Sequence, residues 1–563
     1  MPRAKALPLE SRPLTYLYFF ILVFALYFNT LGNGFLYDEQ ALIINNPYIK
    51  SFRHIPQLFT SDVFHFGLEH SDKYRPLSML AYAVDYFFWG LKPFGYHLTN
   101  IFLHALSGFL IFRLLKLIFQ NDALAILSAT FFCVNPVNLK AVAVIGNRSV
   151  ILEAAFMLLS LCALLTAYLR RGKTRSWLAL VYCLLALLCR EAAVFLPLYV
   201  FVCLSAAGAK RKEAIRCAIP FIILASAYLF FRLFYFKLYE VGPAVFAWQK
   251  IPVFLLLLHN FVTRAILGRH AVFYGPLLVR IIQITVVSAA VLFYAIMLSR
   301  LWLRDKKAWF GLALFAIGSL PFYILLHNIQ FYGVLVFEHY GYLACFGLSF
   351  LFAYLCLGFY RIFPKLTAAS VVLLLTLWSG ITVAANANYK NEEIFYRHIL
   401  AIDKNNALAL LNLADIYFKR NMLDAAEAVA RKVLLREPDV WDAYLTLGNI
   451  CRKRGQLKEA AEFYRQAVFF KPAIEGNHLS LGMALAQQGR FNEAEAVFKQ
   501  ALTSLPKSVN IRKDLGALYG NQGKFAQAIS VWQEALRLQP DNEEIKKNIQ
   551  RAKDLRNKGS FRD

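Results

Sequence analysis

Cysteine is scarce in this chain and follows no recognisable spacing. Nine cysteines occur among 563 residues, and none belongs to a CxxC pair or to a Cys/His set with metal-ligand spacing. Eight lie inside or at the edges of apolar segments, and the ninth, Cys451, falls at a packing position of a repeat. The sequence therefore indicates neither a zinc site nor a disulfide framework.

Acidic residues are also few. The chain has 35 Asp and Glu against 61 Lys and Arg, a formal charge of +26. In a soluble protein this balance would suggest nucleic acid as a partner. Here many basic residues sit in short loops between apolar runs, which indicates membrane orientation instead. We therefore expect a membrane protein that binds no nucleic acid.

A signal-peptide cleavage site is missing as well. Arg3, Lys5 and Arg12 precede the first apolar run, and no small-residue cleavage site follows it. This pattern predicts an uncleaved first membrane helix. Apolar residues make up 59% of the chain, above the 45–50% of average soluble domains. They concentrate in residues 14–385, whereas residues 386–563 read as an ordinary polar helical domain.

Membrane spans follow from the length of the apolar runs. A helix needs about 20 apolar residues to cross the hydrocarbon, because its backbone must bond internally. Two further stretches, 74–91 and 251–267, would break the charge pattern as crossings and are expected to be interfacial or re-entrant helices on the outer side. The eleven predicted spans are 14–31, 95–117, 122–139, 149–168, 176–189, 192–208, 217–238, 274–298, 308–326, 338–360 and 366–385.

The direction of the spans follows from Lys and Arg in short loops. With the N-terminus in the cytoplasm, nearly every basic cluster, such as 170–175 and 210–216, falls on the cytoplasmic side. Eleven spans then place the C-terminal part in the periplasm or a lumen, and we expect a multi-pass protein of a bacterial inner membrane. The predicted membrane domain, 1–385, has a large first outer loop at 32–94.

A 34-residue period follows the membrane domain, over residues 407–540. Position 8 of each unit is Ala or Gly, position 20 is Ala and position 32 is Pro, the pattern of tetratricopeptide repeats. We expect a connecting helix within 386–406 and a capping helix with a tail at 541–563. Such arrays bind proteins or peptides in a groove, although a rigid spacer or a dimerisation surface stays open. The four units start at Ala407, Trp441, Glu475 and Val509.

Ionisable residues near predicted spans are costly and often functional. Tyr37-Asp38-Glu39 follows the first span, and adjacent carboxylates there could supply a general base, a metal ligand or both. Arg148, Arg190-Glu191 and Glu338-His339 lie at span ends on the same outer side. Each alone would be explained by a solvated loop end, an interfacial anchor or a local ion pair. Their shared side indicates that they could converge.

These residues sit in longer motifs. Phe35-Leu36-Tyr37-Asp38-Glu39, Tyr74-Arg75-Pro76-Leu77, and Gly95-Tyr96-His97 with Asn100 follow one another along the chain. Together with the repeats, they resemble the transmembrane and tetratricopeptide repeat-containing family. Its members are relatives of protein O-mannosyltransferases within the GT-C glycosyltransferase superfamily.

The chain departs from the family pattern at two places. Glu39 stands where the family usually has a second aspartate. The segment Asn135-Pro136-Val137-Asn138-Leu139-Lys140-Ala141-Val142 replaces a His-Pro-Val-His-x-Glu-Ala-Val motif, so both histidines and the glutamate are lost. If those groups handle phosphate or protons, donor use is altered or activity is reduced.

The resemblance implies an all-α fold, a GT-C-like membrane helical bundle followed by an α-solenoid of repeats. It also implies transfer of a sugar from a polyprenyl-phosphate donor to an acceptor hydroxyl, a protein Ser or Thr, on the non-cytoplasmic face. Asp38 would be the base, and Glu39 would position the acceptor, share the proton or hold a divalent cation with Asp38. The implied phosphate-binding residues are Arg148, Arg190, His97, Arg75 and His339, and the supporting residues are Glu191, Glu338 and Asn100.

Two alternatives stay open at this point. O-antigen ligases and polymerases are also polytopic, use polyprenyl carriers and carry outward repeat tails, but would lack a required acidic pair in the first outer loop. A catalytically degenerate membrane domain could instead anchor the repeats as a scaffold for envelope assembly. The lost histidines favour the scaffold, and the retained Asp38, Arg148 and Glu191 argue against it.

Overall fold

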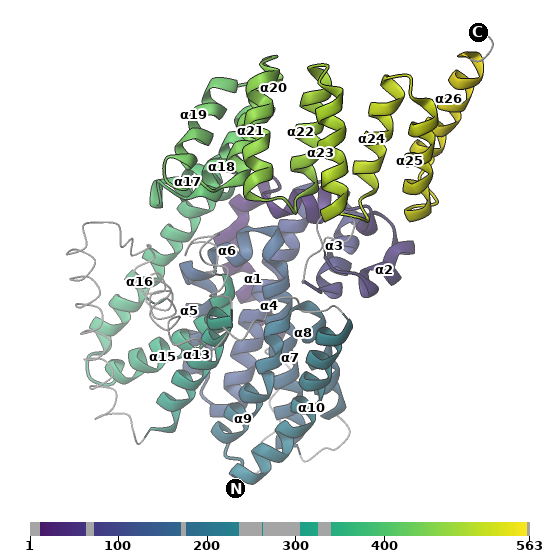
Figure 1. Ribbon diagram of the computed structural model, residues 1–563. Helices are drawn as coiled ribbons and strands as arrows, with labels where there is room; N and C mark the ends of the chain where they lie inside the picture. The colour runs from purple at the N-terminus through teal and green to yellow at the C-terminus, as the bar shows by residue number, and fades with distance from the viewer. Residues whose placement is uncertain are drawn as a thin grey trace. The chain divides into compact units, whose positions relative to one another are not determined.

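The computed structural model describes residues 12–63, 73–170, 176–235, 262, 305–324 and 339–559. These residues form two compact units, Met1–Phe395 and Tyr396–Asp563, and every regular element among them is helical (Figure 1). The prediction of an all-α fold is therefore confirmed. The predicted span 274–298, nearly all of the stretch 251–267 and Glu338 lie outside the described residues.

The first unit is a bundle of long helices with short helices in its first loop. The chain is bent by 48° at the break before Pro136, and the first acidic motif lies just before the short helix η3. The helices are α1 Arg12–Tyr27, η2 Phe28–Gly32, η3 Gln40–Ile44, η4 Tyr48–Lys50, η5 Phe52–His54, α2 Ile55–Thr60, α3 Pro76–Trp89, α4 Pro93–Phe119, α5 Asp122–Val134, η6 Pro136–Asn138, α6 Leu139–Ala143, η7 Ile145–Asn147, α7 Arg148–Leu169, α8 Ser176–Cys189, η9 Glu191–Phe195, α9 Leu196–Ala206, α10 Arg211–Tyr235, α13 Lys306–Ile324, α15 Tyr342–Tyr360, α16 Pro364–Ala385 and η14 Asn386–Tyr389.

Six helices in the described part of the chain are long and apolar enough to cross a membrane, or seven if one bent pair counts as a span. Two shorter apolar helices, Trp177–Cys189 and Glu191–Ala206, coincide with the predicted fifth and sixth spans. The total of eleven spans stays a prediction. The six helices are Pro13–Gly32, Pro93–Phe119, Ile145–Leu169, Arg211–Phe234, His339–Tyr360 and Pro364–Tyr389.

The predicted span 122–139 is not one straight helix. α5 ends at Val134, and the chain resumes at Pro136 after a bend of 48°. Asn135 is extended there, and its side chain accepts a hydrogen bond from the Val137 amide at 3.0 Å. Proline cannot donate a backbone hydrogen bond, so the helix ends before it. The break allows α6, with Lys140, to return toward the first acidic motif.

The core of the bundle is built around α4 and α7. α4 packs against α1, α5 and α7, and α7 packs against α8. α13 and α15 pack closely because each has a glycine at their contact. A Cβ on Gly318 of α13 would lie 2.5 Å from the Ala344 amide nitrogen, and a Cβ on Gly347 of α15 would lie 2.3 Å from the Phe315 amide nitrogen. Small residues allow such close contact between membrane helices.

The second unit is an array of antiparallel helix pairs (Figure 1). In three of the four units the A helix turns into the B helix through a glycine with positive φ, and in the first unit through Asn421 with φ 64°. Glycine adopts this left-handed conformation at little cost. The helices are α17 Glu392–Ile402, which joins the two units, α18 Ala407–Lys419, α19 Leu423–Leu434, α20 Trp441–Lys453, α21 Leu457–Phe470, α22 Glu475–Gln487, α23 Phe491–Ser504, α24 Val509–Asn521, α25 Phe525–Leu538 and α26 Glu543–Gly559.

The repeats pack as the sequence pattern predicts. The ring of Tyr464 fills the space above Gly448, where an added Cβ would meet it at 2.5 Å, and Phe498 does the same above Gly482 at 2.4 Å. Both rings are buried. A small residue at position 8 is therefore needed for the large residue at position 24.

Candidate active site

The first acidic motif sits on a tight turn after η2. Tyr37 has a φ of 40°, a left-handed conformation that is uncommon for a residue with a large side chain. Its amide donates to Glu392 Oε1 at 3.1 Å, and the Glu39 amide donates to the Leu36 carbonyl at 2.8 Å. Local strain of this kind persists only where surrounding contacts hold it. Here it points two adjacent carboxylates in different directions.

Glu39 is turned into the protein. Its side chain is buried, Oε2 accepts from the Leu36 amide at 2.7 Å, and Oε1 accepts from the Gly146 amide at 2.8 Å. Burial raises the pKa of Glu39 to about 8, against these hydrogen bonds, which lower it. Glu39 thus ties the first outer loop to the segment that precedes α7.

Asp38 is turned outward and stays exposed. None of the described residues donates a hydrogen bond to its carboxylate. The surrounding protein nevertheless raises the pKa of Asp38, although Lys73, Arg75 and Lys140 lie close enough to lower it. An accessible carboxylate with a raised pKa beside several cations has the properties of a general base in an anion-binding site.

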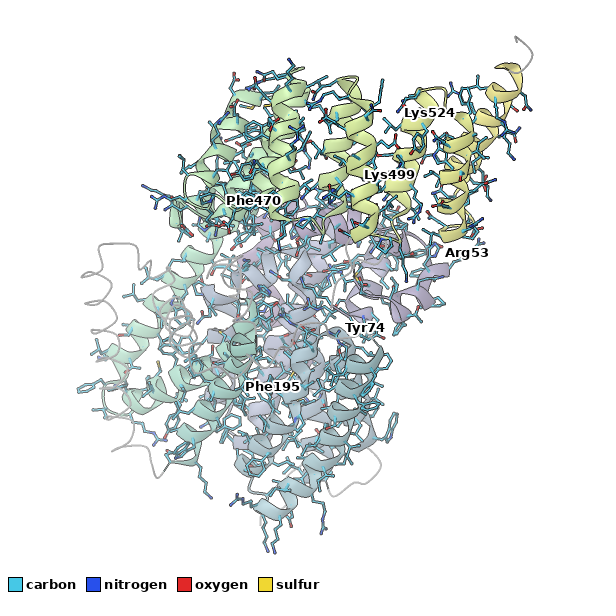
Figure 2. All side chains as sticks on the ribbon, viewed as in Figure 1. Arg53, Tyr74, Phe195, Phe470, Lys499 and Lys524 are labelled. Carbon is cyan, nitrogen blue, oxygen red and sulfur yellow. The ribbon has the colours of Figure 1, made fainter. Side chains whose placement is uncertain are left out.

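Arg75 and Glu191 form one side of this site. Arg75 Nη2 lies 2.9 Å from Glu191 Oε1, and this ion pair joins the residue before α3 to the first residue of η9. Glu191 Oε2 and Arg75 Nε have no hydrogen-bond partner among the described residues. Tyr74, which precedes Arg75, is labelled in Figure 2. The pair is therefore only partly satisfied.

Arg190 lies next to this pair and is almost fully enclosed, with 2% of its surface exposed. Its guanidinium stacks on the ring of Tyr340 with 3.8 Å between the carbon and the ring centre. Nη2 is without a hydrogen-bond partner in the described part of the chain. His339 lies within electrostatic range of Arg190, Lys140, Arg75 and Lys73. Groups from four separate segments, 73–75, 140, 190 and 339–340, therefore meet here.

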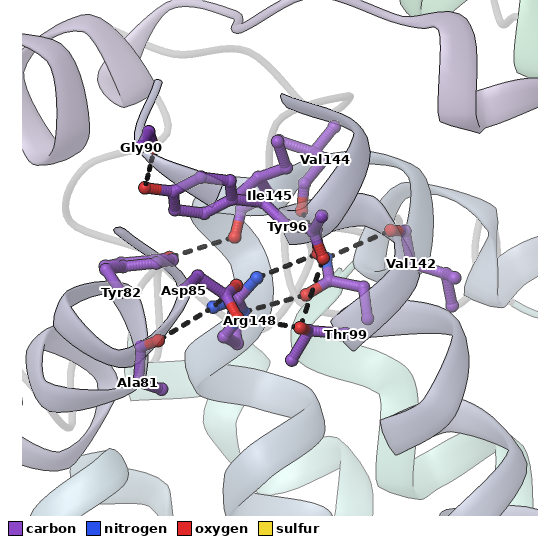
Figure 3. Close-up of polar contacts among 12 residues, drawn as sticks. Ala81, Tyr82, Asp85, Gly90, Tyr96, Thr99, Val142, Val144, Ile145 and Arg148 are labelled. Atoms are coloured by element: carbon purple, nitrogen blue, oxygen red, sulfur yellow. Dashed lines mark hydrogen bonds and ion pairs between the residues drawn. The ribbon is translucent and has the colours of Figure 1, made fainter. Parts of the chain in front are cut away.

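Arg148 belongs to a different arrangement, shown in Figure 3. Its guanidinium is fully buried and lies 2.6 Å from Asp85 Oδ2. Nε donates to Asn100 Oδ1 at 2.9 Å and Nη2 to the Tyr96 carbonyl at 2.8 Å. Nη1 also donates to the Ala81 carbonyl at 3.4 Å. The guanidinium thus has partners on all three nitrogens and connects α7 to α3 and α4.

Two further predicted residues sit in the same network. Asn100 is buried. Its side-chain amide donates a hydrogen bond to the Val142 carbonyl at 3.1 Å, and its side-chain oxygen accepts one from Arg148 Nε. His97 is buried beside Arg148 and the backbone of Asn33. Asp85, the ion-pair partner of Arg148, also accepts a hydrogen bond from Thr99 Oγ1 at 2.8 Å. These residues hold the helices that frame the site.

The predicted site residues therefore divide into two groups. In the first group, Arg75 lies near the outward carboxylate of Asp38 and pairs with Glu191, and His339 lies within electrostatic range of Arg75 and Arg190. Arg148, Asn100 and His97 form the buried network, and Glu39 lies between the two groups. Whether any of them contacts a donor phosphate stays a prediction, and Glu338 lies outside the described residues.

Three residues of the site were not expected from the sequence: Lys73, Lys140 and Glu153. Glu153 is a buried carboxylate in α7 within electrostatic range of Arg190 and Arg75. The sequence does mark Glu153, because it is the one acidic residue in the predicted span 149–168. An ionisable residue inside a span is itself a functional candidate.

A divalent cation finds few ligands in this arrangement. Among the described residues no group of three or more His, Cys, Asp or Glu side chains could hold a metal ion. Glu39 uses both carboxylate oxygens for backbone amides, which leaves Asp38 as a single ligand. The residues present therefore do not fit a cation bridging this pair.

Comparison with known proteins gives related sequences for part of the chain. It is 30% identical over 203 residues to protein O-mannosyl-transferase Tmtc1 of Drosophila melanogaster, 32% over 161 residues to tmtc2 of Xenopus laevis and 31% over 139 residues to TMTC3 of Homo sapiens. These matches cover 34%, 28% and 24% of this chain. The chain spans only 23%, 19% and 15% of the lengths of these relatives.

The repeat region has its own matches. The family model of the cilia and flagella-associated protein 70 middle TPR-like domain matches residues 410–539. Among solved structures, a thermophilic TPR protein of Thermus thermophilus is 22% identical with a TM-score of 0.25, over 31% of this chain and 93% of its own. Yeast Tom70 is 15% identical with a TM-score of 0.27, over 73% and 90%. The chain is therefore similar to TMTC proteins over at most about a third of its length, its repeat region is similar to a TPR-like domain, and its described apolar helices suggest a membrane protein.

Proposed function

We propose that this protein is a membrane glycosyltransferase that moves a sugar from a polyprenyl-phosphate donor to a hydroxyl of an acceptor protein. One observation carries the proposal: the exposed carboxylate of Asp38 lies among Lys73, Arg75 and Lys140, which come from distant parts of the chain. The O-mannosyl-transferase names of its relatives support the same reaction class.

The chemistry assigns one role to Asp38. Its carboxylate takes the proton of the acceptor hydroxyl while the acceptor oxygen bonds to the anomeric carbon of the sugar. The bond from that carbon to the phosphate oxygen breaks, and its electron pair leaves with the lipid phosphate. Attack opposite the leaving group inverts the anomeric carbon. The raised pKa of Asp38 makes the carboxylate a better proton acceptor than an ordinary aspartate.

The cations stabilise the charge that develops on the leaving phosphate. Arg75 and Arg190 offer unpartnered guanidinium nitrogens, and guanidinium groups bind phosphate oxygens with strong, directed hydrogen bonds. Lys73 and Lys140 would add to this field. In this proposal Arg148 is a positioning residue, because its own nitrogens are already bonded.

The compartment and the acceptor form the remaining part of the proposal. With the N-terminus in the cytoplasm, the basic loops stay on the cytoplasmic side and Asp38 faces the periplasm or lumen, where lipid-linked donors meet secreted proteins. The repeats emerge right after the last span, through η14 and α17. Their groove would hold the acceptor or a partner protein.

A substitution at Asp38 tests the reaction. Asp38→Asn removes the proton acceptor without changing its size, so sugar transfer should fall at least about a thousandfold, given the usual 10²–10⁴-fold effect of a positioned base. Asp122→Asn is the matched control, because Asp122 is an exposed partner of Lys116. Transfer from radiolabelled polyprenyl-phosphate mannose to a Ser/Thr peptide is measured alongside thermal unfolding. Full transfer by a folded Asp38→Asn protein would overturn the role of Asp38 as the base and would favour the O-antigen ligase or polymerase alternative, which needs no acidic pair in this loop.

A further inference from the structure

A small cavity lies between α7, α9, α13 and α15 in the membrane unit. It has a volume of about 20 Å³, and most of its walls are apolar, including Val150 and Ile317. Its polar side chains include Glu153, Arg190 and Tyr199. Glu153 Oε1, Arg190 Nη2 and the Tyr199 hydroxyl are each buried without a hydrogen-bond partner among the described residues. An apolar cavity with three unsatisfied polar atoms is unusual, because buried polar groups are normally bonded.

The position of Arg190 requires a negative charge nearby. Arginine keeps its proton at any physiological pH, and a buried charge is costly unless another charge compensates it. Within the described chain no carboxylate forms an ion pair with Arg190, and the neighbouring Glu191 is already paired with Arg75 at 2.9 Å. Glu153 faces the same cavity as Arg190 and lies within electrostatic range of both Arg190 and Arg75.

We propose that Glu153 is the resident counter-ion of Arg190, and that its carboxylate limits how tightly the site holds the lipid phosphate once the sugar has left. The inference rests on the proposed function and goes beyond it, because it concerns release of the product. Before transfer the phosphodiester has one negative charge. After transfer the lipid phosphate monoester has nearly two at neutral pH and above. A fixed carboxylate repels the product more than the donor, and it competes with the product for the same guanidinium.

We expect removal of the Glu153 carboxylate to increase the affinity for a lipid phosphate. A variant that merely lost structure would bind more weakly. Glu153→Gln should bind farnesyl phosphate about three- to tenfold more tightly than the wild type at pH 8.5, because one repelling charge is removed at short range. The methyl phosphodiester of farnesyl phosphate should gain less, and farnesol should be unchanged. Ser160→Ala is the control: it removes another buried polar group of α7, bonded to the Ala179 carbonyl at 2.6 Å, outside the cavity.

Binding is measured on the full-length protein in detergent by isothermal titration calorimetry, so no transfer assay is needed. Glu153→Met, which fills an apolar cavity, removes the same charge and should show the same gain if Glu153→Gln does not fold. A folded Glu153→Gln with unchanged or weaker binding, beside a wild type that binds, would overturn this inference alone. No binding by either protein would overturn the phosphate site of the proposed function together with it. If neither variant folds, the carboxylate is structural and the inference fails.

Discussion

Two buried arginines in this protein differ in how completely the protein satisfies them. Arg148 has protein partners on Nε, Nη1 and Nη2, including Asp85 at 2.6 Å (Figure 3). Arg190, equally enclosed, stacks on Tyr340 and keeps Nη2 without a partner in the described chain. Both stand at the outer ends of predicted spans, so the sequence alone gives them the same description.

The difference separates structure from function. A guanidinium whose hydrogen bonds are all used can bind a ligand only by breaking them, which costs the full desolvation of its former partners. A guanidinium with an unused N–H can donate a hydrogen bond to a phosphate oxygen at little cost. Arg148 therefore holds α3, α4 and α7 together, and we propose that Arg190 binds the donor phosphate.

The largest loss of stability is expected at Arg148, where each guanidinium nitrogen has a partner. Arg148→Lys keeps the charge near Asp85 but cannot reach Asn100 and the Tyr96 carbonyl as well, so buried acceptors lose their donor. We expect the free energy of unfolding to fall by about 3 kcal/mol. Thermal unfolding in detergent measures the loss. An unchanged melting temperature would show that the Arg148 network does not hold the helices.

A smaller effect concerns Glu39, whose pKa burial raises to about 8 from a usual value of 4.5. A raised folded-state pKa stabilises the fold below the unfolded pKa, and this stabilisation is lost as pH rises through the folded pKa. Between pH 6 and pH 9 the wild type should therefore lose about 2 kcal/mol of stability.

The matched variant is Glu39→Gln, which cannot ionise. It should be less stable at pH 6, because an amide can accept only one of the two backbone hydrogen bonds from Leu36 and Gly146. Its stability should then change little up to pH 9. Thermal melting curves of both proteins at four pH values measure this difference. If the stabilities of the wild type and Glu39→Gln changed in parallel with pH, the burial of the Glu39 carboxylate would be contradicted.

Much of the fold follows from periodicity alone. The repeats are readable because each packing requirement, such as a small residue at Gly448 against Tyr464, recurs every 34 residues. The break at Pro136 was harder to foresee, because the apolar run continues through it. Hydropathy measures partition into the membrane and says little about where a helix bends.

The site was only partly predictable, for a related reason. Asp38, Arg75 and Arg190 stand out as charged residues in recognisable motifs. The pairing of Arg148 with Asp85 depends on how α3 folds back against α7, 63 residues apart in sequence, and no local pattern shows it. Lys140 reaches the site only because the helix breaks before it. Which charges are already satisfied is a property of three-dimensional packing, and that property distinguishes the two arginines.

Arg190→Lys gives the sharpest test of the comparison between Arg148 and Arg190. It is the same substitution as Arg148→Lys, made where one guanidinium nitrogen has no hydrogen-bond partner in the described chain. Lysine keeps the charge but loses the planar group that stacks on Tyr340 and the second donor for a phosphate oxygen. We expect affinity for farnesyl phosphate to fall about tenfold, while the melting temperature changes far less than in Arg148→Lys. Calorimetry and thermal unfolding on the same samples give both quantities. If Arg190→Lys unfolds as readily as Arg148→Lys and still binds the lipid phosphate normally, then an unsatisfied nitrogen does not mark a ligand-binding arginine in this protein. The contrast between the two residues would then be one of packing only.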